Sequence, residues 1–274
     1  IGGKQVRPDN GSSIDVISSK GVWMGLVGDG TRKDIRNAVE AAHKASAWEK
    51  NSAHGRAQIL YFIAENLSYR SDEFAKRLVS STGVNVKAAE KEVSLAVERL
   101  FFYAAWADKF DGAVHQPPMR GVTLAMNEAI GVMAIGCPDN APLLAMVSML
   151  APAIAMGNRC VLIPSQRYPL LATDFYQVLE TSDVPGGVVN IVTGERESLM
   201  KVLAEHNQVD ALWYHGTEEG SARVEEASVT NLKRTWVNHG MARDWFDMSA
   251  GQGKRFLREA TQVKNIWIPY GDSV

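Results

Sequence analysis

The sequence predicts an α/β protein built on a doubly wound parallel sheet, and three adjoining segments carry this prediction. Ile130–Cys137 and Cys160–Ile163 are short, apolar and uncharged, as expected of strands that are covered on both faces. Between them, Ala141–Met156 stays apolar but is rich in Leu, Met and Ala, which favour a helix. A strand, a helix and a strand in this order form a βαβ unit with a right-handed connection.

The uncharged run 141–157 could instead be a membrane span. It lies at the short limit for crossing a bilayer, contains Pro142 and Pro152, and lacks flanking aromatic or basic anchors. The sequence therefore favours a buried core helix over a span, and no membrane partner is expected.

Charge and cysteine content limit the functional classes. The 274 residues carry a net charge of −2 with both signs mixed along the chain, which gives no electrostatic case for binding nucleic acid or an anionic membrane. Cys137 and Cys160 both lie in predicted buried strands, which favours a reducing compartment and a cytoplasmic location. Because the chain begins with Ile1 and has no signal segment, we expect it to start within a longer or processed protein.

The first half of the chain is predicted to be mainly helical. Two short strands, Ile1–Lys4 and Ile14–Ser18, are separated by the turn-forming residues Pro8–Gly11. Apolar residues then recur every three or four positions, with a capping residue at Thr31 and a terminating glycine at Gly83. The four amphipathic helices predicted in this way cover segments 31–45, 59–67, 71–83 and 86–107. Such a series needs a common surface to cover, and the sheet supplies it.

In the second half, helices and strands alternate, as in a doubly wound sheet. A β-ribbon of His115–Met119 and Val122–Met126 comes first, weakened by Pro117 and Pro118. After the βαβ unit, the predicted elements are helix 169–181, strand 188–192, helix 199–203 and strand 211–214. The turn Gly216–Gly220 then leads into a helix that ends near Asn231, and strand 235–237 follows. The tail Gln262–Tyr270 is rich in strand formers, yet without a crossover it cannot join the parallel sheet.

Two places could hold a dinucleotide. Gly216–Gly220 lies at a strand-to-helix turn, where free amides and the helix dipole favour phosphate. Two glycines four apart are also typical of an ordinary tight turn, and Glu218 and Glu219 already occupy that helix end. Pro164-Ser165 is the other candidate, because ligands of open α/β sheets bind at the carboxyl ends of the strands.

Cys137 is the candidate nucleophile, because it ends a strand beside Asn140. No His or Glu lies close in sequence to act as its base, so a buried, inert thiol is the favoured interpretation. The six histidines show no metal-ligand spacing, and no metal site is expected.

Four motifs resemble the aldehyde dehydrogenase superfamily in their order along the chain. They are Gly131-Val132, Pro138-Asp139-Asn140-Ala141-Pro142-Leu143, Ala151-Pro152-Ala153-Ile154-Ala155-Met156-Gly157-Asn158 and Pro185-Gly186-Gly187-Val188-Val189-Asn190. The resemblance runs from Ile1 to about Gly240 and resumes in Ser249–Tyr270. It implies a Rossmann-like dinucleotide-binding domain over residues 1–112 and 128–248, and an oligomerisation β-flap over residues 113–127 and 261–270. Full-length members of the family oxidise aldehydes with a nicotinamide cofactor.

The residues that hold the cofactor in that family are only partly kept. The Lys that binds the adenosine ribose is Ile163 here, the acidic residue that shares this ribose is Gln166, and the phosphate turn is one residue shorter. The resemblance therefore implies that NAD binds weakly or not at all. The positions left for the cofactor are Pro164, Ser165, Gly187, Gly216 and Thr217.

The catalytic positions depart further from the family. Asn238 stands where the family has its general-base Glu, although Asn140, the oxyanion donor, is kept. After Gly240 the chain passes within about ten residues to the C-terminal segment, where the family has the catalytic domain with its nucleophilic Cys. This pattern is similar to the truncated second copy of tandem aldehyde dehydrogenases. It implies that the catalytic domain is missing, that no residue here is catalytic, and that the chain is a structural or oligomerisation module.

Two alternatives stay open: a degenerate NAD-binding regulatory module and an active aldehyde oxidoreductase. The expected partners are an aldehyde dehydrogenase catalytic domain, in the same protein or a sister subunit, and further copies of this chain. Large apolar groups such as Trp267 and Ile268 occur on both faces of the tail Val263–Ile268, so the tail and the ribbon are predicted to form a partner-binding edge. The simpler alternative is that the tail only closes a three-stranded sheet with the ribbon.

Overall fold

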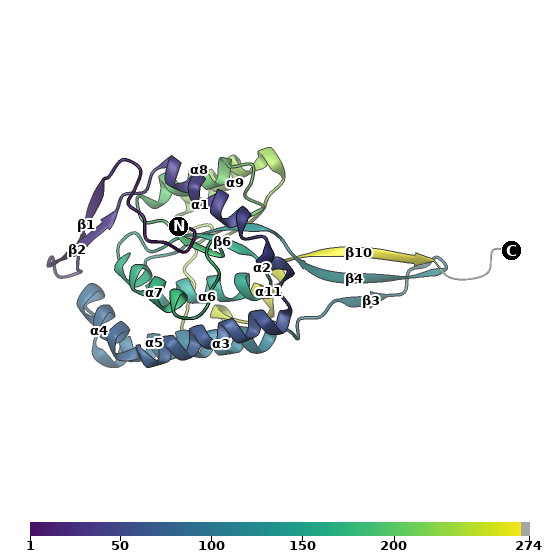
Figure 1. Ribbon diagram of the computed structural model, residues 1–274, viewed down its shortest axis with the longest axis horizontal. Coiled ribbons are helices and arrows are strands. Elements are labelled where there is room, and N and C mark those ends of the chain that lie inside the picture. Colours follow the sequence, from purple (N-terminus) through teal and green to yellow (C-terminus); the bar gives the residue numbers. More distant parts are fainter. Residues whose placement is uncertain (270–274) are drawn as a thin grey trace.

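A five-stranded parallel sheet separates two layers of helices in the computed structural model, which describes residues 1–269 (Figure 1). Its strand order is β7-β6-β5-β8-β9. The first strand of this sheet along the chain, β5, is therefore central, and the later strands add outward on both sides. The strands are β5 (Val132–Gly136), β6 (Arg159–Ile163), β7 (Val189–Ile191), β8 (Ala211–Tyr214) and β9 (Arg234–Val237). All residues of β5, β6 and β8 are buried, and the predicted doubly wound α/β class is confirmed.

One face of the sheet is covered by α1 (Arg32–Lys44), α8 (Arg196–Glu205) and α9 (Glu218–Ala227), the last followed by the 3₁₀ turn η1 (Ser228–Asn231). Helix α1 begins where predicted, because the Thr31 hydroxyl accepts the Asp34 amide while the Asp34 carboxylate accepts the Thr31 amide at 2.8 Å. Val132 and Ala134 of the central strand face this layer, whereas Met133 and Ile135 face the opposite one.

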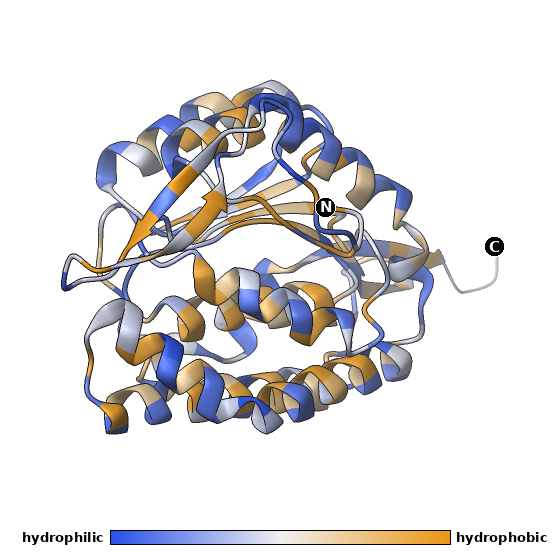
Figure 2. Ribbon diagram, turned by 60° about the vertical axis from the view of Figure 1, so that its left-hand side comes forward, coloured by the Kyte–Doolittle hydropathy of each residue, from blue (hydrophilic) through white to orange (hydrophobic). Residues whose placement is uncertain are grey.

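The second layer is centred on α6 (Pro142–Ala155), whose 14 residues are all buried. Around it lie the remaining helices of this face, which are α3 (Ala53–Tyr69), α4 (Ser71–Thr82), α5 (Val86–Trp106), α7 (Leu170–Glu180) and α11 (Lys254–Glu259), with the short α2 (Ala47–Lys50) and α10 (Met248–Gly251) beside them. Figure 2 shows largely apolar strands between these two helical layers, whose outer sides carry most of the hydrophilic residues. The four helices predicted before the ribbon are confirmed, including the stop at Gly83, which has a φ of 76°.

The predicted strand at Ile1–Lys4 is wrong. This segment is a turn, in which the Lys4 amide donates to the Ile1 carbonyl at 3.1 Å. β1 (Ser13–Ile17) pairs instead with β2 (Trp23–Gly28), which the sequence did not predict, in an antiparallel hairpin. The hairpin turn is closed by the Ser18 amide, which donates to the Val22 carbonyl at 2.8 Å.

A second, three-stranded antiparallel sheet projects from the body as a β-flap (Figure 1). Its order is β10-β4-β3, with β3 (Ala113–His115), β4 (Gly121–Ala129) and β10 (Thr261–Pro269). The predicted ribbon is confirmed, although its first strand is shorter and lies earlier than predicted, and the tail pairs with β4 from Thr261↔Ala129 to Pro269↔Gly121. The last residue assigned to the flap, Tyr270, lies outside the described residues.

One buried side chain holds the base of the flap against the body. Asn158, between α6 and β6, accepts the amides of Ile130 and Gly131 through its Oδ1, at 2.7 and 3.1 Å. Its Nδ2 donates to the carbonyls of Ala153, at 2.9 Å, and Ala260, at 2.7 Å. Because Ile130 follows β4 and Ala260 precedes β10, the Asn158 side-chain amide is hydrogen-bonded to the body end of both strands.

The chain between β9 and β10 is short and packs on the body. Trp245 and Phe256 of this segment are each 1% exposed, and the Phe256 ring packs against Trp213 of β8, Trp236 of β9 and Trp245. Within residues 1–269, no helix combines the length and apolar character needed to cross a membrane.

Candidate functional site

The carboxyl ends of β5, β6 and β8 meet at one edge of the sheet, where ligands of this fold class bind. The loops after these strands bring Cys137, Ser165 and Gly216 to that edge, and α8 begins beside them. We call this region the crevice. Its central feature is a side chain that the sequence analysis did not select, Tyr214.

Tyr214, the last residue of β8, is fully buried against the turn that was predicted to hold phosphate. Its hydroxyl accepts the Thr217 amide at 3.2 Å and donates to Glu197 Oε1 at 2.5 Å. The packing is close enough that a Cβ at Gly216 or Gly220 would overlap the Tyr214 hydroxyl. Burial, together with the hydrogen bond to Glu197, raises the pKa of Tyr214 above its ordinary value, so the hydroxyl keeps its proton.

The amides of the Gly216–Gly220 turn are largely committed to the protein itself. The Gly216 amide donates to Asn238 Oδ1 at 3.0 Å, the Thr217 amide to Tyr214, and the Gly220 amide to the Thr217 hydroxyl at 2.9 Å. This last bond caps α9. Glu218 and Glu219, both exposed in the first turn of the helix, add negative charge where a phosphate would need positive potential.

Arg196 lies across the crevice from the start of α8. Its Nη1 donates to the Cys137 carbonyl at 2.9 Å and lies 3.6 Å from Asp139 Oδ2, while its Nε is 3.4 Å from Glu197 Oε1. The guanidinium carbon stands 5.9 Å from the centre of the Tyr214 ring. A cation that could have bound phosphate is therefore already paired with two carboxylates.

The loop after β6 is held in the same way. The Ser165 hydroxyl donates to Asp139 Oδ1 at 2.6 Å and accepts the Tyr168 amide at 3.0 Å. Gln166 accepts the Arg196 amide at 3.0 Å, so this side chain fixes the start of α8. Pro164 lies beside them and lines a cavity of about 240 Å³, whose other wall includes residues of the β1–β2 hairpin.

Gly187 is not brought to the crevice. It precedes β7, at the amino end of the sheet, with a φ of 93°, and a Cβ there would crowd the Ala41 carbonyl of α1. Its glycine is explained by this close approach of two backbones, not by a ligand. The other four predicted positions, Pro164, Ser165, Gly216 and Thr217, do lie at the carboxyl edge.

The two asparagines of the predicted catalytic positions differ in their surroundings. Asn140 is exposed, and its Nδ2 is 3.4 Å from the Arg243 carbonyl. Asn238 fixes the backbone of the Gly216 turn. Its Oδ1 accepts the Gly216 amide, and its Nδ2 donates to the Gly216 carbonyl at 3.2 Å and to the Met241 carbonyl at 3.0 Å.

Both thiols are fully buried, and burial raises the pKa of Cys137 far above its ordinary value and that of Cys160 to about 12. Across the described part of the chain, no three His, Cys, Asp or Glu side chains are grouped so as to hold a metal ion.

Tyr214, Glu197, Arg196 and Asp139 are residues of the crevice that were not predicted from the sequence. The signals in the sequence were weak: Tyr214 stands two residues before Gly216, and the Glu195-Arg196-Glu197 run precedes the predicted helix 199–203.

Comparisons with known proteins identify the family of the chain. The sequence profile of the aldehyde dehydrogenase family matches residues 6–245. The chain is 32% identical over 246 residues to an aldehyde dehydrogenase of Agaricus bisporus, covering 88% of this chain and 49% of that protein. It is 30% identical over 250 residues to the human mitochondrial 10-formyltetrahydrofolate dehydrogenase, covering 88% of this chain and 27% of that protein.

Solved structures give the same result. The crystal structure of PnpE in complex with nicotinamide adenine dinucleotide matches with a TM-score of 0.83 and 30% identity, over 86% of this chain and 49% of the other. The chain thus spans about half the length, or less, of the relatives it matches. On sequence and fold together, the chain belongs to the aldehyde dehydrogenase family.

Proposed function

We propose that this chain is a non-catalytic structural module of an NAD-dependent aldehyde dehydrogenase, in which the dinucleotide crevice is filled by its own side chains. The observation that carries the proposal is the Tyr214 hydroxyl, which lies between the Thr217 amide and Glu197 in the phosphate turn. The groups present do not fit a pyrophosphate, because donors of the turn are used internally and three carboxylates, those of Glu197, Glu218 and Glu219, surround it.

The energetic penalty for binding NAD follows from these contacts. Moving Tyr214 out of the turn breaks its bond to the charged Glu197, which is worth about 1.5–3 kcal/mol, and exposes a buried aromatic ring worth about as much again. A penalty of at least about 3 kcal/mol corresponds to more than about a hundredfold in Kd. Ile163 adds to it, because a buried ribose hydroxyl left unpaired costs about 1–3 kcal/mol.

The catalytic groups support the same proposal. Asn238 carries no carboxylate and its amide already makes three hydrogen bonds, so it has no proton-accepting role. Cys137 is a poor nucleophile, because its buried thiol resists ionisation. The short connection from β9 to β10 replaces the catalytic domain of the family, and its Trp245 and Phe256 pack tightly on the sheet.

The β-flap supports a role in assembly. Its outer strands, β3 and β10, each have one edge that pairs with no strand of residues 1–269, and Val114, Val263 and Trp267 are 70%, 58% and 58% exposed. An apolar edge of this kind favours pairing with another sheet. We infer that it pairs with a family catalytic domain, in the same protein or a sister subunit, or with a second copy of this chain.

Calorimetric titration of the chain with NAD and NADP tests the filled crevice. The wild type should give no saturable heat up to about 1 mM, whereas Tyr214→Ala, which empties the turn, should give a measurable isotherm. Tyr214→Phe is the matched control, because it keeps the ring but loses the bond to Glu197, and it should therefore bind NAD more weakly than Tyr214→Ala. Micromolar affinity in the wild type would refute the proposal and favour the NAD-binding regulatory module.

Assays with aldehydes test the absence of catalysis. Incubation with NAD or NADP and a panel of aliphatic and aromatic aldehydes should give no reduced cofactor by absorbance at 340 nm. Turnover that disappears in Cys137→Ala would show instead that the chain is an active oxidoreductase.

A further inference from the structure

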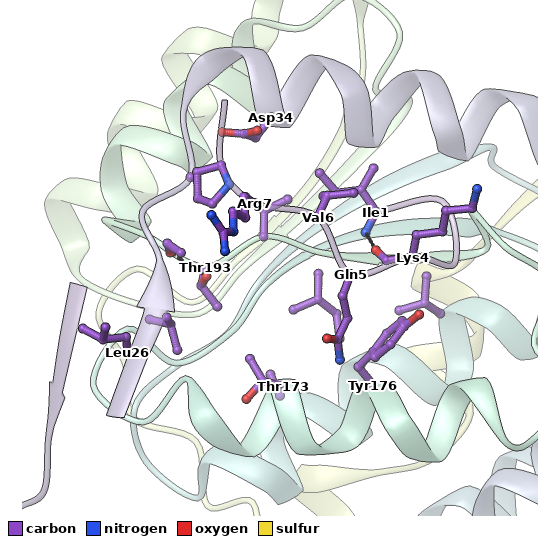
Figure 3. A pocket seen from close by; sticks show the side chains of 18 residues that line it. Ile1, Lys4, Gln5, Val6, Arg7, Leu26, Asp34, Thr173, Tyr176 and Thr193 are labelled. Atoms are coloured by element: carbon purple, nitrogen blue, oxygen red, sulfur yellow. Dashed lines mark hydrogen bonds between the residues drawn. The ribbon is translucent and has the colours of Figure 1, made fainter. Parts of the chain in front are cut away.

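A second cavity, of about 300 Å³, lies on the opposite side of β7 from the crevice, at the free edge of the parallel sheet. Figure 3 shows how it is enclosed: the N-terminal segment crosses over it, α7 forms its floor with Thr173 and Tyr176, and the β1–β2 hairpin and the start of α1 close the far side. Its walls include the apolar side chains of Val6, Leu26 and Val192.

Most polar groups around the cavity are already engaged. Asp34 accepts the amides of Thr31 and Asp9 and the Thr31 hydroxyl, so its carboxylate is committed to capping α1. The Thr193 hydroxyl donates to the Gly28 carbonyl at 2.7 Å, and the Tyr176 hydroxyl to the Gly3 carbonyl at 2.9 Å. These bonds shape the wall and leave few free donors.

Arg7 is the exception. Its guanidinium makes no hydrogen bond or ion pair within residues 1–269, and Figure 3 shows it directed into the cavity near Thr193. The neighbouring Lys4 has its ammonium directed away from the cavity in the same view. The exposed, forked guanidinium of Arg7 therefore faces a cavity whose wall combines polar and apolar groups, and no carboxylate of residues 1–269 forms an ion pair with it.

The edge of β7 supplies a second donor. The Cys160 amide donates to the Val188 carbonyl, and the Val192 amide to the Leu162 carbonyl, so residues 188, 190 and 192 bond to β6. The intervening residues, Val189 and Ile191, must direct their amides and carbonyls toward the free edge, because backbone groups alternate along a strand. Both residues line the cavity.

We propose that this cavity binds a monocarboxylate with a short apolar chain. The carboxylate would pair with the Arg7 guanidinium, which matches its two oxygens, and would accept the free amide of Ile191. The chain would lie against Val6, Leu26 and Val192. A volume of about 300 Å³ is at the lower end of the range for ligand pockets, which suits a molecule of roughly ten heavy atoms and excludes a dinucleotide.

Octanoate is the probe that tests the proposal, by calorimetry and by amide chemical shifts of the full chain. The wild type should bind it saturably, with shifts confined to β7, the N-terminal segment and α7. Arg7→Gln should weaken binding at least about tenfold, the effect of losing one charge-assisted contact. Arg7→Lys should bind with intermediate affinity, because the charge is kept but the fork is lost.

Two further variants separate the cavity from general effects. Thr173→Phe fills the cavity from α7 and should also weaken binding, while thermal unfolding by circular dichroism verifies that each variant is folded. Arg120→Gln removes another exposed arginine, in the flap, and should bind like the wild type.

The proposal is overturned if octanoate does not saturate the wild type at millimolar concentration, or if Arg7→Gln binds as tightly as the wild type. If octanol binds as tightly as octanoate, the carboxylate is not recognised. If inorganic phosphate binds as tightly as octanoate, the apolar wall contributes nothing to binding, and the proposal is overturned as well. None of these results depends on NAD binding in the crevice.

Discussion

The carboxyl group of Glu92 provides the sharpest test of the packing beneath the sheet. Glu92 lies on α5 and is 4% exposed, and its Oε1 accepts the amides of Leu143 and Leu144, at 3.0 and 3.2 Å, in the first turn of α6. No ion pair joins it to a cation in the described part of the chain. Burial raises the pKa of Glu92 to about 7 and outweighs the two amide hydrogen bonds, which act in the opposite direction.

The magnitude follows from the shift. Between an ordinary pKa of 4.5 and about 7, the native carboxyl group holds a proton that the unfolded chain has lost. The stability that this proton provides is fully present below pH 4.5 and is lost as the pH rises through 7. At 1.36 kcal/mol per unit, the loss over this window is about 3 kcal/mol. Glu92→Gln keeps an oxygen for both amides but removes the titration.

Urea denaturation of the wild type and of Glu92→Gln at pH 5, 6, 7 and 8 measures this loss directly. The difference in the free energy of unfolding should shift by about 3 kcal/mol in favour of the variant as the pH rises from 5 to 8. Glu90→Gln, exposed on the same helix, should give no such trend. Parallel curves for the wild type and Glu92→Gln would refute the reasoning, since the carboxyl group would then not titrate near neutral pH.

Three further predictions concern other buried or exposed groups. His215 is 2% exposed and neither ring nitrogen has a hydrogen-bond partner; burial, together with the charges of Arg243 and Arg255, lowers its pKa to about 3. The free energy of unfolding should therefore fall as the pH drops below 6.5, because the unfolded chain binds a proton that the native imidazole does not. Urea denaturation of His215→Leu should not show this decrease at acid pH. Asn158→Ala leaves the Ile130 and Gly131 amides and the Ala260 carbonyl without this partner, whereas the Ala153 carbonyl keeps the backbone amide of residue 158, so the free energy of unfolding should fall by about 3–6 kcal/mol. Trp267→Asp should abolish self-association in light scattering while leaving circular dichroism unchanged, whereas a wild type that stays monomeric at high concentration would remove the edge-pairing idea.

Elements with strong local signals were predictable from the sequence. Thr31 and Asp34 form the capping box that starts α1, and Gly83 ends α4 in the left-handed conformation. The bounds of β8, Ala211–Tyr214, agree with the prediction because the strand is bounded by polar and glycine residues. In each case a few neighbouring residues decide the outcome.

The N-terminal hairpin was not predictable, because pairing there depends on contacts outside the local pattern. β2 contains Gly25, whose φ is 148°, and ends at Gly28, so it lacks a run of strand formers. The turn-forming residues Pro8–Gly11 suggested the wrong partner for β1, while the actual turn lies at Ser18–Val22.

The position of the Tyr214 side chain in the crevice could not be predicted for a different reason. Both faces of β8 are buried, so alternation along the strand does not reveal that Trp213 faces α6 and α11 while Tyr214 faces α8 and α9. The sequence showed which family residues were lost, such as the ribose-binding Lys at Ile163. It did not show that the Tyr214 hydroxyl would form its hydrogen bonds inside the Gly216–Gly220 turn.

The junction at Asn158 makes the flap a stiff lever. β4 and β10 each contain nine residues, paired along their whole length, so at about 3.3 Å per residue the arm reaches roughly 30 Å from its pivot. A force applied near its tip acts on the four hydrogen bonds of the Asn158 side-chain amide, which lies between the end of α6 and the start of β6. A partner that tilts the flap by a small angle therefore transmits its torque to the core of the molecule. Conversely, a rigid pivot presents the flap to partners in one orientation, which reduces the entropy lost on assembly.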